Sequence, residues 1–265
     1  MTRPERPVAA EWLALRRAAD AAARDRAARL VTEWSSSVAG SGEPVTVFDV
    51  GAGTGANRAY LAPRLSFPAR WVLLDHDAEL LAAPGNRGAR CVVGGIGELD
   101  RLVAAASGAR LVTCSALLDL LTTAELDELA GALARHRVAG LFSLSVDGSL
   151  RIDPQHPDDD AIAAAFNAHQ SRDGRPGPRA AAHLAAGCAS LGLTVRRADS
   201  PWLLDAGSAP LVRRLLTERV GAAVEWRPQL GPAAEDWLTT RLTSLDDAAL
   251  TVRVGHVELL VTPPG

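Results

Sequence analysis

Short apolar runs alternate with segments of helical periodicity over residues 45–146. Five of these runs are rich in β-branched and other apolar residues and are typical of buried strands, at 45–50, 71–74, 90–93, 110–114 and 139–146. The segments between them predict helices at 56–64, 78–83, 96–106 and 123–137. Strands that alternate with helices favour right-handed crossovers, so this part of the chain predicts a parallel sheet.

The pattern changes on both sides of this alternation. Residues 9–38 predict helix, in one or two pieces, with a loop before residue 45. After residue 150, helices are predicted at 158–170, 179–191, 209–225 and 233–245, and strands at 193–197 and 249–261. The last strand is expected to be kinked or bulged near Gly255. Residues 171–178 are rich in Gly and Pro and predict a loop or lid.

The composition is that of a folded α/β protein. The chain has 265 residues, of which 48% are hydrophobic, enough for one large core or one core with an added lobe. The net charge of −3 and the absence of any basic field weigh against a nucleic-acid partner. No apolar run reaches the length needed to span a membrane, and residues 1–7 lack the apolar stretch of a signal peptide.

The cysteines predict no metal site. Cys91, Cys114 and Cys188 are far apart, with neither metal-ligand spacing nor the pattern of a disulfide framework. Unpaired cysteines are typical of a reducing compartment, so we expect a cytoplasmic protein.

A glycine-rich turn follows the first predicted strand. The strand ends at Asp49, and Gly51, Gly53 and Gly55 follow at alternate positions, with Ala52 between the first two. Glycine is needed where a turn requires positive φ or where a ligand touches bare backbone. Because a helix is predicted directly after the turn, its N-terminal N–H groups would face that ligand. The segment therefore predicts a cofactor-binding strand–turn–helix unit.

An acidic residue stands where such a unit needs one. Asp75 ends the second predicted strand, twenty residues after Gly55. A carboxylate there can accept hydrogen bonds from both ribose hydroxyls of a nucleoside lying across the strand ends. The alternative is that Asp75 only caps a helix. His76 follows as a further cofactor contact, and Asp77 is suited to be the N-cap of the next helix.

The glycine spacing distinguishes two cofactor classes. A dinucleotide fingerprint reads G-x-G-x-x-G, whereas this chain has D-V-G-A-G-T-G over residues 49–55. That run resembles the first motif of class I methyltransferases, which use S-adenosylmethionine. Several stretches are also similar to a group of uncharacterised bacterial methyltransferases, at 12–24, 71–81, 111–121, 165–170, 200–202 and 254–257. The segment 173–179 departs from that group.

The resemblance implies a fold and an activity. The fold is a Rossmann-like sheet of seven strands with helices on both faces, mostly parallel, whose last strand runs antiparallel between strands five and six. N-terminal helices and a helical addition before the last strand extend it. The implied activity is S-adenosylmethionine-dependent methyl transfer to a small-molecule acceptor. We expect a single domain over 1–265, comprising a helical cap (1–44), a cofactor-binding half (45–150) and an acceptor-side half (151–265).

The resemblance also implies cofactor contacts further along the chain. Gly95 stands where relatives often have an Asp that binds the adenine amino group, so a backbone carbonyl or Glu98 would substitute for it. Ile96 is expected to pack on the adenine face. Ser115 and Ala116, small enough for close approach, would lie beneath the methionine part of the cofactor.

Asp119 and one charged face of the N-terminal helix have alternative interpretations. Asp119 either bonds the cofactor ammonium or caps a turn, and it is also a candidate for substrate binding. Arg16, Asp20 and Arg24 share one helix face, since they repeat at four-residue intervals. Either they form a solvated ion-pair ladder, or Arg16 or Arg24 holds the cofactor carboxylate while Asp20 orients the arginine.

The acceptor side is predicted from polar residues after the fifth strand. Asn167 and Gln170 are candidate acceptor-binding residues, and His169 is the first candidate for a catalytic base because imidazole takes a proton near neutral pH. The alternative is that this cluster fixes the following loop structurally. Asp147 is a second candidate base, with a turn-forming alternative because Gly148 follows it. His256 and the tryptophans are more typical of the core.

Other function classes fit less well. A non-catalytic protein that senses S-adenosylmethionine or S-adenosylhomocysteine would keep the same cofactor site. A nicotinamide oxidoreductase would carry the longer glycine spacing. A nucleic-acid methyltransferase would show a basic face or an Asn/Asp-Pro-Pro-aromatic motif after the fourth strand, where this chain has C-S-A-L-L-D over 114–119. The sequence leaves a monomer and a homodimer equally open.

Overall fold

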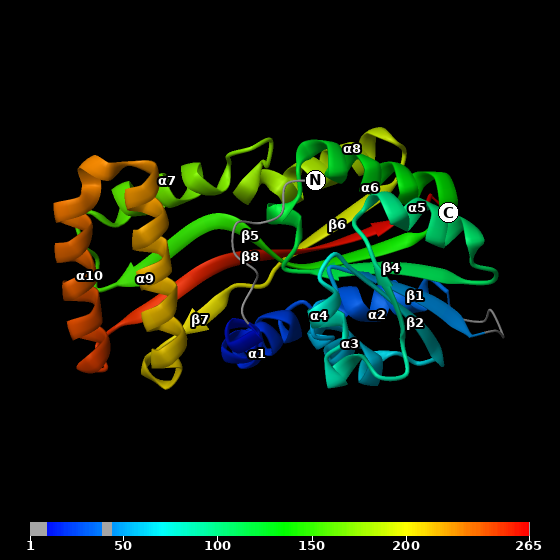
Figure 1. Cartoon of the computed structure of the whole chain (residues 1–265), viewed down its shortest axis with the longest axis horizontal. Coiled ribbons are helices and arrows are strands. Elements are labelled where there is room, and N and C mark those ends of the chain that lie inside the picture. The colour runs from blue at the N-terminus through cyan, green and yellow to red at the C-terminus, as the bar shows by residue number, and fades with distance from the viewer. Residues whose placement is uncertain (1–9, 39–43, 265) are drawn as a thin grey trace.

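One twisted sheet runs through the whole molecule (Figure 1). The computed structural model describes residues 10–38 and 44–264. In spatial order the strands are β3 (Arg90–Val93), β2 (Ala69–Asp75), β1 (Val45–Val50), β4 (Arg110–Ser115), β5 (Ala139–Asp153), β8 (Thr251–Thr262) and β6 (Thr194–Asp199). The first five are parallel, and β8 is antiparallel to both of its neighbours. The predicted Rossmann-like α/β fold with an inserted antiparallel strand is therefore confirmed.

The predicted number of seven strands is wrong, because the described chain contains an eighth. β7 (Trp202–Leu204) pairs with the outer part of β8. The segment follows Pro201 and is three residues long, too short to show an alternation of apolar and polar positions. It forms a strand because β8 extends far enough beyond the main sheet to offer it a partner.

β5 is longer than its predicted end at residue 146. Its pairing with β8 shifts register between Phe142 and Ser145 and again between Val146 and Leu150. Such shifts mark bulges, which bend a strand without ending it. The second one lies opposite Gly255, where a Cβ atom would stand 2.0 Å from the Ser149 hydroxyl oxygen. The expected irregularity near Gly255 is thus confirmed, and it leaves both strands continuous.

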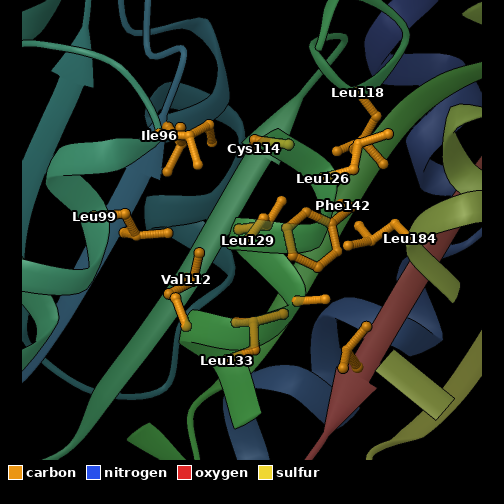
Figure 2. Close-up of a cluster of buried hydrophobic side chains, with 14 of the residues drawn as sticks. Ile96, Leu99, Val112, Cys114, Leu118, Leu126, Leu129, Leu133, Phe142 and Leu184 are labelled. Carbon is orange, nitrogen blue, oxygen red and sulfur yellow. The ribbon is translucent and has the colours of Figure 1, made fainter. Parts of the chain in front are cut away.

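Helices cover both faces of the sheet. On one face lie α5 (Gly97–Ala105), α6 (Thr123–His136) and α8 (Ala180–Ser190), above the sheet in Figure 1. Figure 2 shows their leucines packed with Val112 and Phe142 of the central strands. On the opposite face lie α2 (Ala28–Ser36), α3 (Ala56–Leu61) and α4 (Ala78–Leu81). Burial of these apolar faces is the main favourable term holding the layers together.

A third apolar core supports the outer halves of β5 and β8. It is formed with β7 by α1 (Ala10–Asp25), α7 (Asp159–Gln170), α9 (Ala209–Trp226) and α10 (Gly231–Asp246). The helical addition before the last strand is therefore confirmed. Short 3-10 turns complete the chain at Ala62–Arg64, Pro84–Asn86, Leu118–Leu120, Gly177–Arg179, Ala206–Ser208 and Pro228–Leu230.

The N-terminal helix is in two pieces, which separate at residues 26–27. The start of the predicted cap (1–9) and part of the loop expected before residue 45 (39–43) lie outside the described residues. Over the ranges 10–38 and 44–264, no helix combines the length and apolar character that crossing a bilayer requires.

A buried polar network ties α7 to α10. The Asp159 carboxylate accepts a hydrogen bond from Trp237 Nε1 at 2.7 Å and an ion-paired one from Arg241. Arg241 is 1% exposed and also donates to the Pro154 carbonyl oxygen. Removing one partner of such a pair leaves an uncompensated buried charge.

We therefore expect Asp159→Ala to lower the free energy of unfolding by about 3–5 kcal/mol, measured by urea denaturation. Asp160→Ala is the matched control, because Asp160 is exposed on the same helix turn and forms no hydrogen bond or ion pair with the described residues. This substitution should change stability by less than about 0.5 kcal/mol. Equal effects of the two substitutions would show that the network contributes no stability.

Candidate functional site

The strand register brings the predicted cofactor residues to one edge of the sheet. Val50 of β1 pairs with Leu74 of β2 on one side and with Cys114 of β4 on the other. The residues that follow each strand therefore leave the sheet side by side. In an open α/β sheet this carboxyl edge is where ligands bind.

The glycine turn has the backbone conformation that its sequence predicts. Gly51, Gly53 and Gly55 all have positive φ, at 67°, 52° and 85°. A Cβ on Gly55 would lie 2.3 Å from Asn86 Oδ1, because Asn86 closes over the turn and donates from Nδ2 to the Gly53 carbonyl oxygen at 2.9 Å. A Cβ on Gly53 would meet only Leu13, at 3.9 Å. Gly53 is thus the turn residue whose missing side chain leaves space.

Asp75 anchors this turn instead of capping a helix. Its carboxylate accepts from the Gly53 N–H at 2.8 Å and from the Asp77 N–H at 2.9 Å. The N-cap of α4 is Asp77, as predicted, since Asp77 accepts from the N–H groups of Glu79 and Leu80. Asp75 is 6% exposed, and His76 Nδ1 lies 3.3 Å from it. A carboxylate offers about four acceptor positions, so Asp75 retains capacity for ligand hydroxyls.

Asp49 is fully buried with one carboxylate oxygen unpaired. Oδ1 accepts from Asn57 Nδ2 at 2.6 Å, whereas Oδ2 has no hydrogen-bond partner among the described residues. Burial is the main reason why the pKa of Asp49 rises to about 7, although Asn57 and Arg24 oppose the rise. A cationic ligand group would stabilise the charged form of this residue.

Arg24 is the complementary buried cation. It is 3% exposed, donates from Nη2 to Asn57 Oδ1 at 2.9 Å and stacks on Tyr60 with 3.8 Å between the guanidinium carbon and the ring centroid. Its Nε is buried without a partner in the described part of the chain. Desolvation lowers the pKa of Arg24, and Glu258, Tyr60 and Asp49 oppose this.

Arg16 and Asp20 form a bidentate pair one turn away, at 2.8 and 3.1 Å. Asp20 also accepts from Trp202 Nε1 at 3.0 Å, and the Arg16 guanidinium lies over the Trp202 ring. The side chains of Arg16 and Asp20 are 13% and 20% exposed. The ion pair of the ladder alternative is therefore present between Arg16 and Asp20, but it is half-buried and does not extend to Arg24, which bonds Asn57.

The remaining predicted cofactor residues lie along the same edge. Gly95 and Ile96 follow β3, and the Ile96 side chain packs into the core shown in Figure 2. Ser115 is half-buried at the end of β4, and Ala116 has a φ of 54° and donates its N–H to the Ser143 carbonyl oxygen. Asp119 follows in a 3-10 turn, where desolvation raises its pKa against the opposing charges of Arg16 and Arg175.

Glu258 is a buried acid at this edge that the sequence did not single out. It is 2% exposed, lies on β8 and accepts from the N–H of Leu144 at 3.2 Å. Leu144 has a φ of 57°, within the first bulge of β5. Burial raises the pKa of Glu258. The sequence does not indicate that Glu258 has a buried partner, because the Leu144 N–H is turned toward Glu258 only by the bulge in β5.

Of the three polar residues predicted for the acceptor side, His169 and Gln170 contact each other, and Asn167 contacts β5 instead. Asn167 donates from Nδ2 to the Gly148 carbonyl oxygen at 2.9 Å. His169 is buried, with Nε2 3.4 Å from a Glu225 carboxylate oxygen on α9. Gln170 lies beside the other imidazole nitrogen at 3.4 Å. These contacts tie α7 to β5 and α9, which agrees with the structural alternative for the cluster.

Asp147 lies inside β5, in the second bulge. It is exposed, and its Oδ1 accepts from the N–H and the hydroxyl of Ser149 at 2.9 and 2.7 Å. Gly148 follows with a φ of 81°. These contacts are the ones expected from the turn-forming alternative for Asp147.

His256 and Trp202 form an aromatic pair beside α1. Their ring centroids are 4.8 Å apart, and His256 Nδ1 lies 3.1 Å from the Val254 carbonyl oxygen. Burial, together with the charges of Arg16 and Arg219, lowers the pKa of His256 to about 3. His256 is therefore neutral at physiological pH.

Two hollows lie away from this edge. One of about 400 Å³ is lined by the outer ends of β5, β7 and β8, including Arg151, Leu203 and Arg253. The other, of about 580 Å³, is lined by Arg26, Arg29 and Arg197. Neither includes a residue of the glycine turn. Within the described ranges, no three His, Cys, Asp or Glu side chains are placed to hold a metal ion.

Comparison with solved structures identifies the fold. No protein-family model matches the chain, and no curated protein matches its sequence. A cyclopropane-fatty-acyl-phospholipid synthase-like protein from Lactobacillus casei is 15% identical, with a TM-score of 0.50 over 97% of this chain and 94% of that chain. A protein described as a candidate type II methyltransferase from Anaeromyxobacter dehalogenans is 16% identical, with a TM-score of 0.51 over 89% and 95%. The chain has the fold of the class I methyltransferases.

The raised pKa of Asp49 predicts a pH-dependent stability. The folded-state value of about 7 lies above the ordinary 3.8, so Asp49 stabilises the fold at low pH and this contribution is lost as the pH rises toward 7. We expect Asp49→Asn to raise the free energy of unfolding of the ligand-free protein by about 2–4 kcal/mol at pH 8 and to change it little at pH 4. Urea denaturation at both pH values measures this.

The exposed Asp236 on α10 provides the control, since Asp236→Asn should alter stability equally little at both pH values. A stability loss of Asp49→Asn at pH 8 would show that ionised Asp49 is stabilised in the fold, contrary to the burial argument.

Proposed function

We propose that this protein transfers a methyl group from S-adenosylmethionine to a small-molecule acceptor. The observation that carries the proposal is the pair of buried, unpaired polar atoms beside the glycine turn. Asp49 Oδ2 lacks a donor and Arg24 Nε lacks an acceptor, and Asn57 links the two side chains. Buried polar groups are normally satisfied, so this arrangement is suited to a ligand that carries both an ammonium and a carboxylate.

The other parts of the cofactor match the rest of the edge. The amino-acid end would lie against Asp49 and Arg24, with Arg16 as a second cation for its carboxylate. The ribose would lie on Asp75 and His76, at the space left open by Gly53. The adenine would follow the backbone of Gly95 and Ile96, and the small Ser115 and Ala116 would allow close approach of the methionine part. Gly51 and Ala52 complete the turn.

The protein's part in the reaction is alignment and exclusion of water. When bound, the cofactor supplies an electrophilic methyl group on its sulfonium. α1 covers the glycine turn through Leu13, and Trp202 of β7 is hydrogen-bonded to α1. This covering would shield the attacking atom from water and hold it in line with the methyl group.

We retain His169 as the first candidate base and Asp147 as the second, with Asn167, Gln170 and Asp119 as candidate acceptor contacts. His169 Nε2 lies 3.4 Å from Glu225 without a hydrogen-bond partner among the described residues, and Asp147 binds Ser149 through Oδ1 alone. His256 is the weaker base, because its pKa is lowered to about 3. No observation favours the non-catalytic sensor.

The proposal also covers the domain organisation, the location and the partners of the protein. We infer one functional domain over 1–265, in which residues 45–150 hold the cofactor and 151–265 the acceptor. All three cysteines are unpaired, which supports a cytoplasmic location. We further propose a monomer or homodimer that acts without nucleic acid or membrane.

Calorimetry with S-adenosylmethionine, S-adenosylhomocysteine and NAD tests the cofactor assignment. We expect heat from the first two ligands and none from NAD.

Gly53→Val should abolish cofactor binding, because the valine side chain fills the open space and strains a φ of 52°. Asp75→Ala should weaken binding by about 1–3 kcal/mol. Gly192→Val is the control, since Gly192 also has a positive φ, of 79°, on an exposed turn. Binding of NAD alone would refute the assignment.

His169→Ala and Glu225→Gln together test the base. Acceptors are first sought by release of S-adenosylhomocysteine from a panel of small molecules. If His169 is the base, its removal should lower turnover about 100-fold or more, whereas Glu225→Gln should leave most of it and cofactor affinity should not change in either variant. Matching losses of melting temperature in both variants, with turnover preserved, would assign the pair a structural role.

A further inference from the structure

Arg219 is a buried cation without a counter-charge. It lies on α9, is 4% exposed, and its Nε and Nη1 have no hydrogen-bond partner among the described residues. No carboxylate in the described ranges forms an ion pair with it. Buried arginines are normally paired, because desolvating a guanidinium is costly. Burial lowers the pKa of Arg219 to about 10, so it stays charged at neutral pH.

Among the described residues, the Arg219 guanidinium stacks on an aromatic face. Its central carbon lies 4.2 Å from the centroid of Phe166 on α7. Stacking on a ring uses the flat face of the guanidinium and leaves the in-plane N–H donors unused. The arrangement orients Arg219 without satisfying it.

Arg219 lies on the helix that packs behind Trp202. Leu216 and Ala223, on either side of Arg219 in α9, share one apolar core with Trp202. Trp202 stacks on His256 and is hydrogen-bonded to Asp20 of α1, and the same helix places Leu13 beside Gly53. Contacts therefore lead from the glycine turn through α1 to the aromatic pair, and the core behind this pair includes the part of α9 that carries Arg219.

The neighbouring charges do not neutralise Arg219. Arg16, the other cation acting on His256, is paired with Asp20. Arg175, which acts with Arg16 on Asp119, is paired with Asp173 at 3.1 Å. The acid facing His256 is Asp147, whose Oδ1 is bound to Ser149. Of these three cations, Arg219 is thus the one that forms no ion pair with a carboxylate of the described residues.

We propose that Arg219 binds an anionic group of the methyl acceptor, a carboxylate or a phosphate. This deepens the proposed function and rests on it. The acceptor would enter with its anion on Arg219 and its reactive end beside His256 and Trp202, toward the cofactor. Arginine is suited to this task because its planar fork of donors matches both carboxylate and phosphate oxygens.

The test uses the full chain saturated with S-adenosylhomocysteine. Sodium benzoate and sodium pyrophosphate are titrated separately by calorimetry, so that the two arms distinguish a carboxylate from a phosphate. We expect one probe to bind, and Arg219→Gln to weaken its binding at least tenfold. Arg213→Gln is the matched control on α9, since Arg213 is exposed and paired with Asp246. Its affinity for the probe should equal that of the unaltered protein.

A purely structural role for Arg219 predicts different results. In that case Arg219→Met, which keeps the volume and removes the charge, would lower the melting temperature and leave probe binding intact. The proposal expects the reverse, with melting temperature equal or higher and probe binding lost. Equal probe affinity in Arg219→Gln and Arg213→Gln, or binding of neither probe to the unaltered protein, would overturn it.

The proposed function can fail separately. If S-adenosylhomocysteine does not bind, the same titrations are made on the ligand-free protein. Anion binding that depends on Arg219 would then stand without methyl transfer. If S-adenosylhomocysteine binds and Arg219→Gln changes nothing, the cofactor assignment stands and the anionic acceptor is wrong.

Discussion

The predicted cofactor edge depends on two linked buried hydrogen bonds, from Asn57 to Asp49 and from Arg24 to Asn57. They join the end of β1 to the start of α3 and to α1, three elements that apolar packing alone would leave free to slide. One amide serves both charges, since Asn57 donates to the carboxylate and accepts from the guanidinium. A charge in the interior must be paired or hydrogen-bonded. These hydrogen bonds therefore restrict α1 to one position over the glycine turn.

That position has consequences for the neighbouring elements. With Arg24 inserted beside Tyr60, the helix presents Asp20 and Arg16 to Trp202 one and two turns earlier. The short strand β7 is thereby held against α1 as well as against β8. The ion pair of Arg16 and Asp20 is shielded from water by this contact, and a shielded pair is screened less by salt than one on the surface.

The second determinant of the architecture is the pair of bulges in β5. The first turns the Leu144 N–H toward Glu258 at the cofactor edge. The second, held by Asp147 and Ser149, lets the strand bend and continue beyond the sheet. The extension of β5 and β8 then supports a separate core with its own helices. The same two strands thus place Glu258 beside the predicted cofactor edge and, further out, support the third apolar core.

The sequence by itself determined the first half of the fold and the glycine turn at the carboxyl edge of the sheet. Buried parallel strands read as continuous apolar runs, and a turn that needs positive φ needs glycine, so both are visible along the chain. The inserted antiparallel strand and the helical addition were also predictable. What only the tertiary structure decided is set by contacts distant in sequence: the continuation of β5 through its bulges, the eighth strand β7, the burial of Glu258 and Arg219, and the separate partners of Asn167 and His169. Periodicity reports which face of an element is buried, but not which residue of another element meets it there.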